Sequence, residues 1–378
     1  MALSSYILCG KRVITDAKGA FEFKDLSPDL WFTLLAARDG YVPEITKSID
    51  PVKVPTVFLK LAAKPPVTNF SGTVRGRVIE VDGSPIPYAI INPTGLISGE
   101  KGASSYGTIS GLEPIAITNK QGEFEVSYSK PTPKMLLEVE ARAFAPKFTV
   151  METGPDQRSV TLNEGAVIVG RLIQNGKPVP NAQIGLIPKD RGGFVSDLKI
   201  VGNPFRPTRQ ADTIVSAECT SAHYEVVRIG TDANGRFSIP DVPANVDWYL
   251  YPTMDSVSAL GAASPIEVRV SKDGESVQVP DLVINPGVHV RGTVLASDNK
   301  PIANGMQVTL SSETVWDTQT VPLASDGHSE FSNVPGGKYT INVSVKGYHE
   351  NKPQFGPPPF MVDHDIDNFT TTVYPNVP

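Results

Sequence analysis

The sequence predicts an all-β protein built from four small two-sheet sandwiches in a row, of which the first is incomplete. Three observations lead to this prediction. The chain has 32 Gly and 34 Pro among its 378 residues. It is nevertheless 40% hydrophobic, which indicates short strands with frequent turns rather than a disordered polymer. In addition, one turn motif returns along the chain, so the same small domain is repeated.

The returning motif has the form Thr-Asp-x-x-Gly-x-Phe. It occurs at 15–21, 118–124 and 231–237, and a degraded fourth copy lies at 325–331, where Ser329 replaces the glycine. Its Asp or Asn can accept hydrogen bonds from the backbone that follows, and its Gly supplies a left-handed conformation. The motif therefore predicts a turn between two strands, and its Phe begins an inward-facing alternation.

A second motif precedes each of the last three turns. A Gly-x-Val or Gly-x-Leu segment starts at Gly76, Gly170 and Gly292 and runs into Asp-Gly, Asn-Gly or Asp-Asn, which tolerate the positive φ of a tight hairpin. A proline follows two residues later, where a missing donor suits a strand entry or edge. These prolines are Pro85, Pro178 and Pro301. Together the elements amount to about seven strands per module, as in a two-sheet sandwich. The stretch 134–145 suits either a helix or a strand.

Repeated joints predict the module boundaries. Gly165 and Gly287 each lie five residues before the first glycine of the next module. The predicted modules are 1–66, 67–163, 164–286 and 287–378, and the third carries a long insertion near 188–229. Only 14 residues precede Thr15, so the first module lacks its first strand or two. We expect that the chain belongs to a longer polypeptide in which a preceding segment completes this sandwich.

The order of these motifs, continued by [Leu/Val]-Pro-x-Gly-x-Tyr and Gly-Tyr, resembles the carboxypeptidase regulatory-like domain. The similarity covers nearly the whole chain in four copies, with departures at Asn119 and Ser329. The resemblance implies Ig-like/transthyretin-like (prealbumin-like) modules, related to the carbohydrate-binding-like β-sandwiches. It also implies a place beside carboxypeptidases, without their activity.

The sequence carries no pattern of catalytic residues. None of its histidines lies in His-Glu-x-x-His or His-x-x-Glu, so the ligand set of a zinc peptidase is missing. The acidic segment 362–368 and the turn aspartates could hold a cation, but the interleaved carboxylates of a calcium loop are not present. Cys9 and Cys219 fall in different modules and are expected to be unbridged thiols. We therefore expect no enzymatic activity, no metal and no cofactor.

The candidate ligand contacts are side chains in loops. The insertion of the third module holds Phe205, Arg206 and Tyr224, and it forms either a surface hairpin or a loop that binds a ligand or partner.

The three tryptophans differ in their surroundings. Trp31 and Trp248 lie in predicted strands beside other aromatic residues and are expected in the core. Trp316 lies in the polar stretch 311–318, so it is the indole to test for stacking on a sugar ring.

Charge and hydropathy narrow the function. The 34 Lys+Arg and 40 Asp+Glu give a net charge of −6 without charge runs, which argues against nucleic acid or a polybasic membrane patch. The N-terminal apolar stretch is too short to span a bilayer, and no signal peptide is visible. We interpret the chain as a non-catalytic extracytoplasmic scaffold or adhesion region, at the cell surface, in the periplasm or secreted. Its partner would be a polysaccharide or another protein domain. The alternative is an accessory portion of a larger metallopeptidase or membrane sensor.

Overall fold

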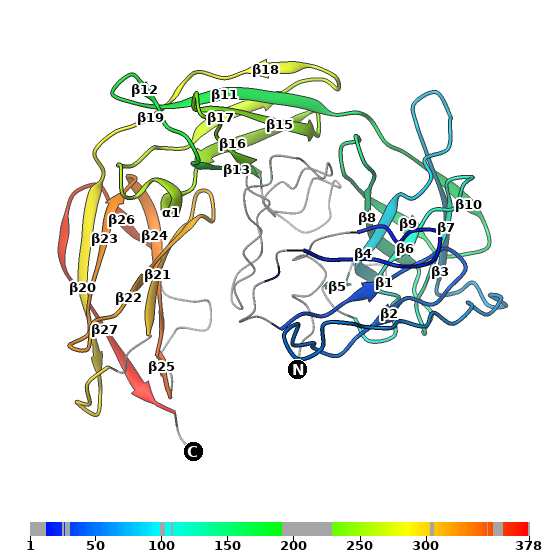
Figure 1. Ribbon diagram of the computed structural model, residues 1–378, viewed down its shortest axis with the longest axis horizontal. Helices are drawn as coiled ribbons and strands as arrows, with labels where there is room; N and C mark the ends of the chain where they lie inside the picture. Colours follow the sequence, from blue (N-terminus) through cyan, green and yellow to red (C-terminus); the bar gives the residue numbers. More distant parts are fainter. Residues whose placement is uncertain are drawn as a thin grey trace.

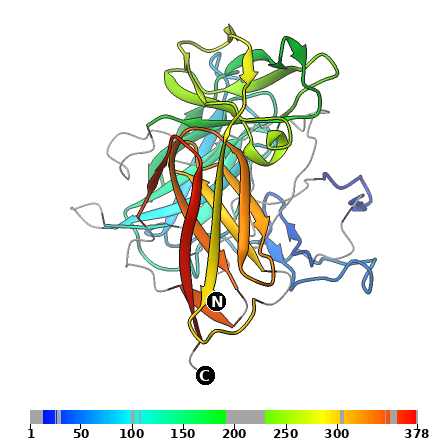
Figure 2. The same cartoon turned by 90° about the vertical axis from the view of Figure 1, so that its left-hand side faces the viewer.

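The computed structural model describes residues 13–24, 26, 31–98, 103–106, 109–190, 229–302, 306–345, 347–350 and 358–376. Their sheets group into three sandwiches that follow one another along the chain, and Figure 1 shows them as an arch. Figure 2 shows the fourth module in front of the second, with the third above both. The predicted all-β architecture of tandem sandwich modules is confirmed. Among the described residues, no helix has the length and apolarity of a membrane span.

The first module shows little regular structure in its described part. Its strands are β1 (Leu35–Ala36) and β2 (Glu44–Ile45), which pair antiparallel and lie beside the second module (Figure 1). This is the segment from which the sequence predicted an incomplete sandwich.

The second module is a sandwich of two sheets. One sheet has the order β10 (Gln157–Thr161), β3 (Thr73–Ile79) and β7 (Glu123–Ser127). The other has β5 (Ala103–Tyr106), β4 (Ile90–Ser98), β8 (Lys134–Glu140) and β9 (Lys147–Glu152), with β6 (Ala116–Ile117) also paired to β4. Side chains from both sheets, among them Val74, Phe124 and Leu137, form one core. The ambiguous stretch 134–145 is a strand over Lys134–Glu140 and then a turn, so the helical alternative is wrong.

The third module repeats this plan. One sheet has β12 (Lys177–Pro178), β11 (Ala166–Gln174) and β15 (Arg236–Val242), with β18 (Ser276–Gln278) and β19 (Leu282–Ile284) parallel to β11. The other has β14 (Ile229–Gly230), β13 (Gln183–Pro188), β16 (Val246–Pro252) and β17 (Ile266–Val270). Helix α1 (Met254–Val257) follows β16. Trp248 is 0% exposed in the core, as predicted.

The fourth module has two sheets of four strands. Their orders are β23 (His328–Val334), β20 (Val288–Ala296), β27 (Ile366–Pro375), β25 (Tyr348–Glu350), and β22 (Thr318–Pro322), β21 (Gln307–Ser312), β24 (Gly337–Ser344), β26 (Phe360–Val362). In all three sandwiches the first strand pairs antiparallel with the strand after the repeated turn and parallel with the last strands. The modules are thus copies of one topology.

The repeated turns form as the sequence predicts. Oδ1 of Asp16, Asn119 and Asp232 accepts hydrogen bonds from the backbone N–H groups two and four residues on, at 2.8–2.9 Å. The preceding Thr118 and Thr231 are buried and hydrogen-bonded on both sides of their hydroxyls. These polar residues therefore shape turns.

The fourth turn differs from the predicted alignment of 325–331 by two residues. Gly327 has φ +83° and its N–H donates to the carbonyl of Ala324 (2.9 Å), as the turn glycines do in the other copies. Ser329 consequently takes the place of the first Phe, opposite the strand glycine, and Phe331 takes the next inward position. The prediction that Ser329 replaces the turn glycine is wrong. It aligned Phe331 with the first Phe of the other copies, whereas Phe331 lies two residues further along the strand.

Candidate functional site: the joint between the third and fourth modules

The loop between β21 and β22 contacts the third module. Val315, at the tip of this loop, is buried against Ile187 and Tyr251 on the outer face of the sheet that contains β13 and β16. Burying an apolar side chain of this size contributes about 1.5–3 kcal/mol. The loop therefore holds the fourth module against the third.

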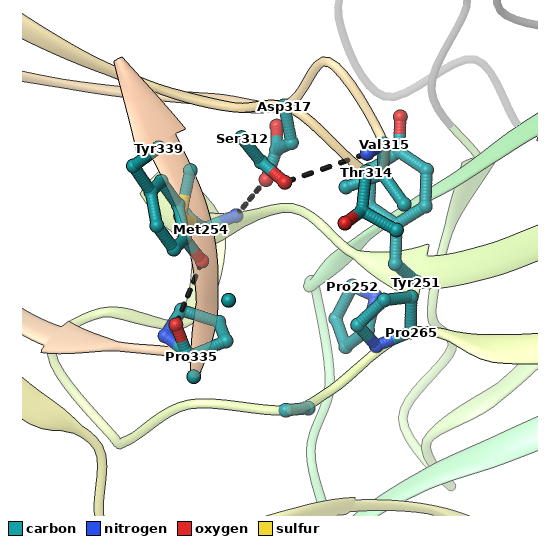
Figure 3. A pocket seen from close by; sticks show the side chains of 13 residues that line it. Tyr251, Pro252, Met254, Pro265, Ser312, Thr314, Val315, Asp317, Pro335 and Tyr339 are labelled. Carbon is teal, nitrogen blue, oxygen red and sulfur yellow. Dashed lines mark hydrogen bonds between the residues drawn. The ribbon is translucent and has the colours of Figure 1, made fainter. Parts of the chain in front are cut away.

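A buried carboxylate makes the second contact of the joint. Asp317 is 5% exposed, and its Oδ2 accepts a hydrogen bond of 2.6 Å from the N–H of Met254, the first residue of α1 (Figure 3). An N–H in the first turn of a helix has no partner within the helix, so an acceptor from outside satisfies it. A carboxylate acceptor is about twice as strong there as a neutral one.

Further hydrogen bonds join α1 and its flanking residues to the fourth module. The side-chain amide of Asn333 donates to the carbonyl of Ser258 (2.7 Å), and its Oδ1 accepts from the N–H of Gly287 (3.3 Å). The N–H of Thr320 donates to Oδ1 of Asp255 (3.4 Å). Since the bonds to Ser258 and Asp255 reach the α1 segment from two strands, β23 and β22, and Asn333 is itself held by Gly287, the joint restricts rotation as well as separation of the modules.

Tyr339 closes the joint from the side of β24. Its hydroxyl donates to the carbonyl of Pro335 (2.8 Å), and the residue is buried (Figure 3). Burial, and then the carboxylate of Asp317, raise the pKa of Tyr339 above its ordinary value. The phenol therefore stays protonated and keeps its hydrogen bond throughout the physiological pH range.

Trp316 lies between the two anchored residues and is turned outward. It is 50% exposed and has φ +56°, a left-handed conformation that costs a non-glycine residue roughly 1–2 kcal/mol. The loop closes tightly through hydrogen bonds from the N–H of Trp316 to the carbonyl of Ser312 (2.9 Å) and from the N–H of Ser312 to the carbonyl of Asp317 (2.8 Å), and Trp316 adopts the left-handed conformation within this turn. The result is an indole presented to solvent, at the position that the sequence singled out.

The space enclosed at this joint is small. It measures about 30 Å³ and is lined by Pro252, Met254, Val315 and Tyr339 among others (Figure 3). That volume holds about one water molecule. A sugar could therefore meet Trp316 only on the outer surface.

The remaining sequence-predicted residues do not gather at this joint. Phe205, Arg206 and Tyr224 lie outside the described residues. Trp31 is 66% exposed, so its predicted place in the core is wrong. The described part of the first module offers only the short strands β1 and β2 near it, and these supply no core of the kind that surrounds Trp248.

The acidic loop and the histidines outside 191–228 make contacts at the surface. His364 lies 2.5 Å from its neighbour Asp363, and His289 pairs with Glu330 at 3.0 Å. In the part of the chain that the structure describes, no group of three or more His, Cys, Asp or Glu could hold a metal ion. Sequence reasoning missed Val315, Asp317 and Met254, because their roles depend on a contact between modules that no local motif encodes.

No protein-family model matches the chain, and no curated protein matches it. Among solved structures it is similar to the Bacillus anthracis TIE protein, at 12% identity and a TM-score of 0.21, over 88% of this chain and 53% of that one. The chain thus spans about half the length of that structure. It is also similar to the streptococcal ancillary pilin (10% identity, TM-score 0.23, 80% and 98% covered) and to the minor pilin of Streptococcus agalactiae (12%, 0.26, 56% and 98%). These structural similarities are distant.

Proposed function

We propose that the chain is a non-catalytic scaffold or adhesion region that works outside the cytoplasm. Its modules would be 1–66, 67–163, 164–286 and 287–378. The observation that carries the proposal is the joint in which Val315 and Asp317 are buried against the third module. Modules that only share a linker move relative to each other, whereas a buried, hydrogen-bonded contact holds them in one arrangement. Fixed spacing between modules is what a scaffold requires.

The joint between the second and third modules supports the same interpretation. The side-chain amide of Asn163 donates to Oδ2 of Asp273 (2.8 Å), across the linker. A Cβ added to Gly165 would lie 2.7 Å from the carbonyl carbon of Asp241 and 3.0 Å from Cβ of Ala145. Only a glycine with φ +75° fits between these neighbours, so the linker is held tightly on both sides.

The expected location can be tested on cells of the source organism. Antibodies raised against the purified chain should label intact cells or appear in the culture medium or periplasmic fraction. A cytoplasmic protein of known location serves as the control for cell integrity. Labelling that requires lysis of the inner compartment would overturn the extracytoplasmic proposal.

A second, finer proposal is favoured by Trp316. A half-exposed indole on a left-handed backbone is a costly arrangement, and costs of this kind accumulate at binding sites. We infer that Trp316 contacts a polysaccharide, with its ring stacked on a sugar face. A glycan array with the intact chain and the variant Trp316→Ala tests it. Binding that is lost in the variant supports the proposal, and binding that is unchanged, or absent from both, contradicts it.

A further inference from the structure

The joint between the first and second modules contains a hollow that is open to solvent. It measures about 300 Å³, and its walls come from the turn after β1, the linker near Lys64 and the segment that includes β6. Pockets that hold small ligands start at about this volume. The space at the joint between the third and fourth modules is smaller, about 30 Å³, and Val315 is buried there.

A partly buried charge cluster lines the hollow. Nζ of Lys64 lies 2.8 Å from Oε2 of Glu113, 3.2 Å from the carbonyl of Glu125 and 3.5 Å from its Oε1. The side chains of Lys64 and Glu113 are only 16% and 17% exposed. Pairing with one ammonium group compensates the partial loss of water around these charges, and it holds the two carboxylates on either side of Lys64.

One carboxylate oxygen of this cluster is left to accept a further hydrogen bond. Oε2 of Glu113 takes both bonds that the structure gives this side chain, from Lys64 and from the N–H of Ser127 (2.8 Å). Within the described part of the chain, its Oε1 has no donor. An ionised carboxylate accepts through both oxygens, so Oε1 is available to a ligand hydroxyl.

The rim supplies a donor and an aromatic face. The guanidinium of Arg38 lies 5.0 Å from the ring centre of Tyr41, and both residues line the hollow. Among the described residues, Arg38 has no carboxylate or carbonyl partner. Its guanidinium therefore lies over the ring, and no acceptor among the described residues takes a hydrogen bond from its five N–H donors. Pro65 and Pro66 add apolar surface to the same wall.

The combination selects the chemical class of the ligand. An anion would meet Asp39, Glu113 and Glu125, and a cation would meet Arg38 and Lys64. A neutral molecule with several hydroxyl groups avoids both conflicts, because each hydroxyl donates to a carboxylate or accepts from a guanidinium. We propose that this hollow binds one ring of a neutral sugar. The inference deepens the proposed function, since it rests on the chain acting as an adhesion region and gives it a ligand.

The experiment titrates the intact chain with neutral hexoses and their disaccharides. Calorimetry gives the affinity, and NMR shows whether the chain contacts the sugar. At least one of these sugars should bind. Arg38→Ala should weaken its binding about tenfold, by loss of roughly one hydrogen bond to a charged group, and Tyr41→Ala should weaken it by a similar factor, by loss of the aromatic face. Arg269→Ala, which removes an exposed arginine of the third module that pairs with Asp247, is the matched control and should leave this affinity unchanged. The corresponding uronic acid should bind about tenfold more weakly than the neutral sugar.

Three results would overturn the inference. The first is that a chain with a normal thermal unfolding transition binds no neutral sugar. The second is that Arg38→Ala and Tyr41→Ala both leave the affinity unchanged. The third is that the uronic acid binds more tightly than the neutral sugar. Each of these would leave the scaffold proposal in place, because antibody labelling of cells and the rigidity of the other joint test that proposal separately.

Discussion

The ring of Phe124 occupies the space that a side chain on Gly76 would need. A Cβ built on Gly76 would lie 2.4 Å from both Cε1 and Cζ of Phe124, and the two residues pair directly across β3 and β7. Gly170 and Phe237 repeat the relationship in the third module, at 2.5 Å. The glycine of one sequence motif and the phenylalanine of the other thus form a single packing unit.

This unit predicts the cost of adding one methyl group. Gly76→Ala should destabilise the second module by about 1–3 kcal/mol, because the added atom overpacks the space beneath the ring. Urea unfolding of the intact chain measures the change. Gly336→Ala, whose Cβ would meet nothing closer than 3.6 Å, is the control and should cost less. The double variant Gly76→Ala/Phe124→Leu should lose less free energy of unfolding than the two single variants lose together. Full additivity would contradict the contact between the two residues.

The fourth module shows where sequence reasoning reached its limit. There the strand glycine, Gly292, lies opposite Ser329, and Phe369 from β27 fills the space, with its Cβ 2.8 Å from the position of an added Cβ. The sequence predicted the strands, turns and glycines well, because these depend on local backbone conformation. It did not predict that an aromatic ring could arrive from a different strand, since that exchange is visible only once β20 and β27 pair.

The candidate site was predictable only in part, for the same reason. Polar neighbours correctly indicated that Trp316 is exposed. The same polar setting concealed Asp317, which is buried against α1 of another module. For Trp31, aromatic neighbours indicated a core that the described part of the first module does not form around it. Contacts between modules leave no periodic signal in either partner.

The buried threonine of the repeated turn should be sensitive to loss of its hydroxyl. Oγ1 of Thr231 donates to the carbonyl of Val179 (2.7 Å) and accepts from the N–H of Ala182 (2.9 Å). Thr231→Val should destabilise the third module by about 1–3 kcal/mol, because both partners remain buried. Amide exchange at Ala182 should also accelerate. Thr293→Val, which removes an exposed hydroxyl bonded to His328, should change stability less. Equal effects of the two variants would contradict this account.

The Gly-Tyr turns provide a test of backbone strain, because two substitutions there should change the stability in opposite directions. Gly347 has φ +85° with open space around its Cβ position, whereas Ala143 has φ +70° in the corresponding turn of the second module. Gly347→Ala should destabilise the chain by about 1–2 kcal/mol, and Ala143→Gly should stabilise it by up to about 1 kcal/mol. Thermal unfolding of each variant gives the sign. A loss of stability in Ala143→Gly would show that strain does not dominate at that turn.

Acid should weaken the third module through one ion pair. Arg171 holds Asp281 by two contacts, Nε to Oδ1 at 3.2 Å and NH2 to Oδ2 at 2.5 Å, and this hydrogen bonding lowers the pKa of Asp281 below its ordinary 3.8. A lowered native pKa stabilises the fold above the unfolded value, and the contribution disappears as pH falls through the native pKa. The stability difference between the chain and Asp281→Asn should therefore shrink between about pH 5 and pH 2. A difference that stays constant over this range would exclude the pair as its source.

The central claim is that Val315 and Asp317 hold the third and fourth modules in one arrangement. Pulsed electron–electron double resonance, which measures the distance between two spin labels, tests it on the intact chain. Cys9 and Cys219 are replaced by serine, and the labels are attached to cysteines introduced at two exposed positions, Lys177→Cys and Ser297→Cys. We predict one narrow distance distribution, which broadens in Asp317→Ala and changes little in Asp317→Asn, where a side-chain oxygen can still accept from Met254. A broad distribution in the unaltered joint, or a narrow one that survives Asp317→Ala combined with Val315→Ala, would contradict the claim.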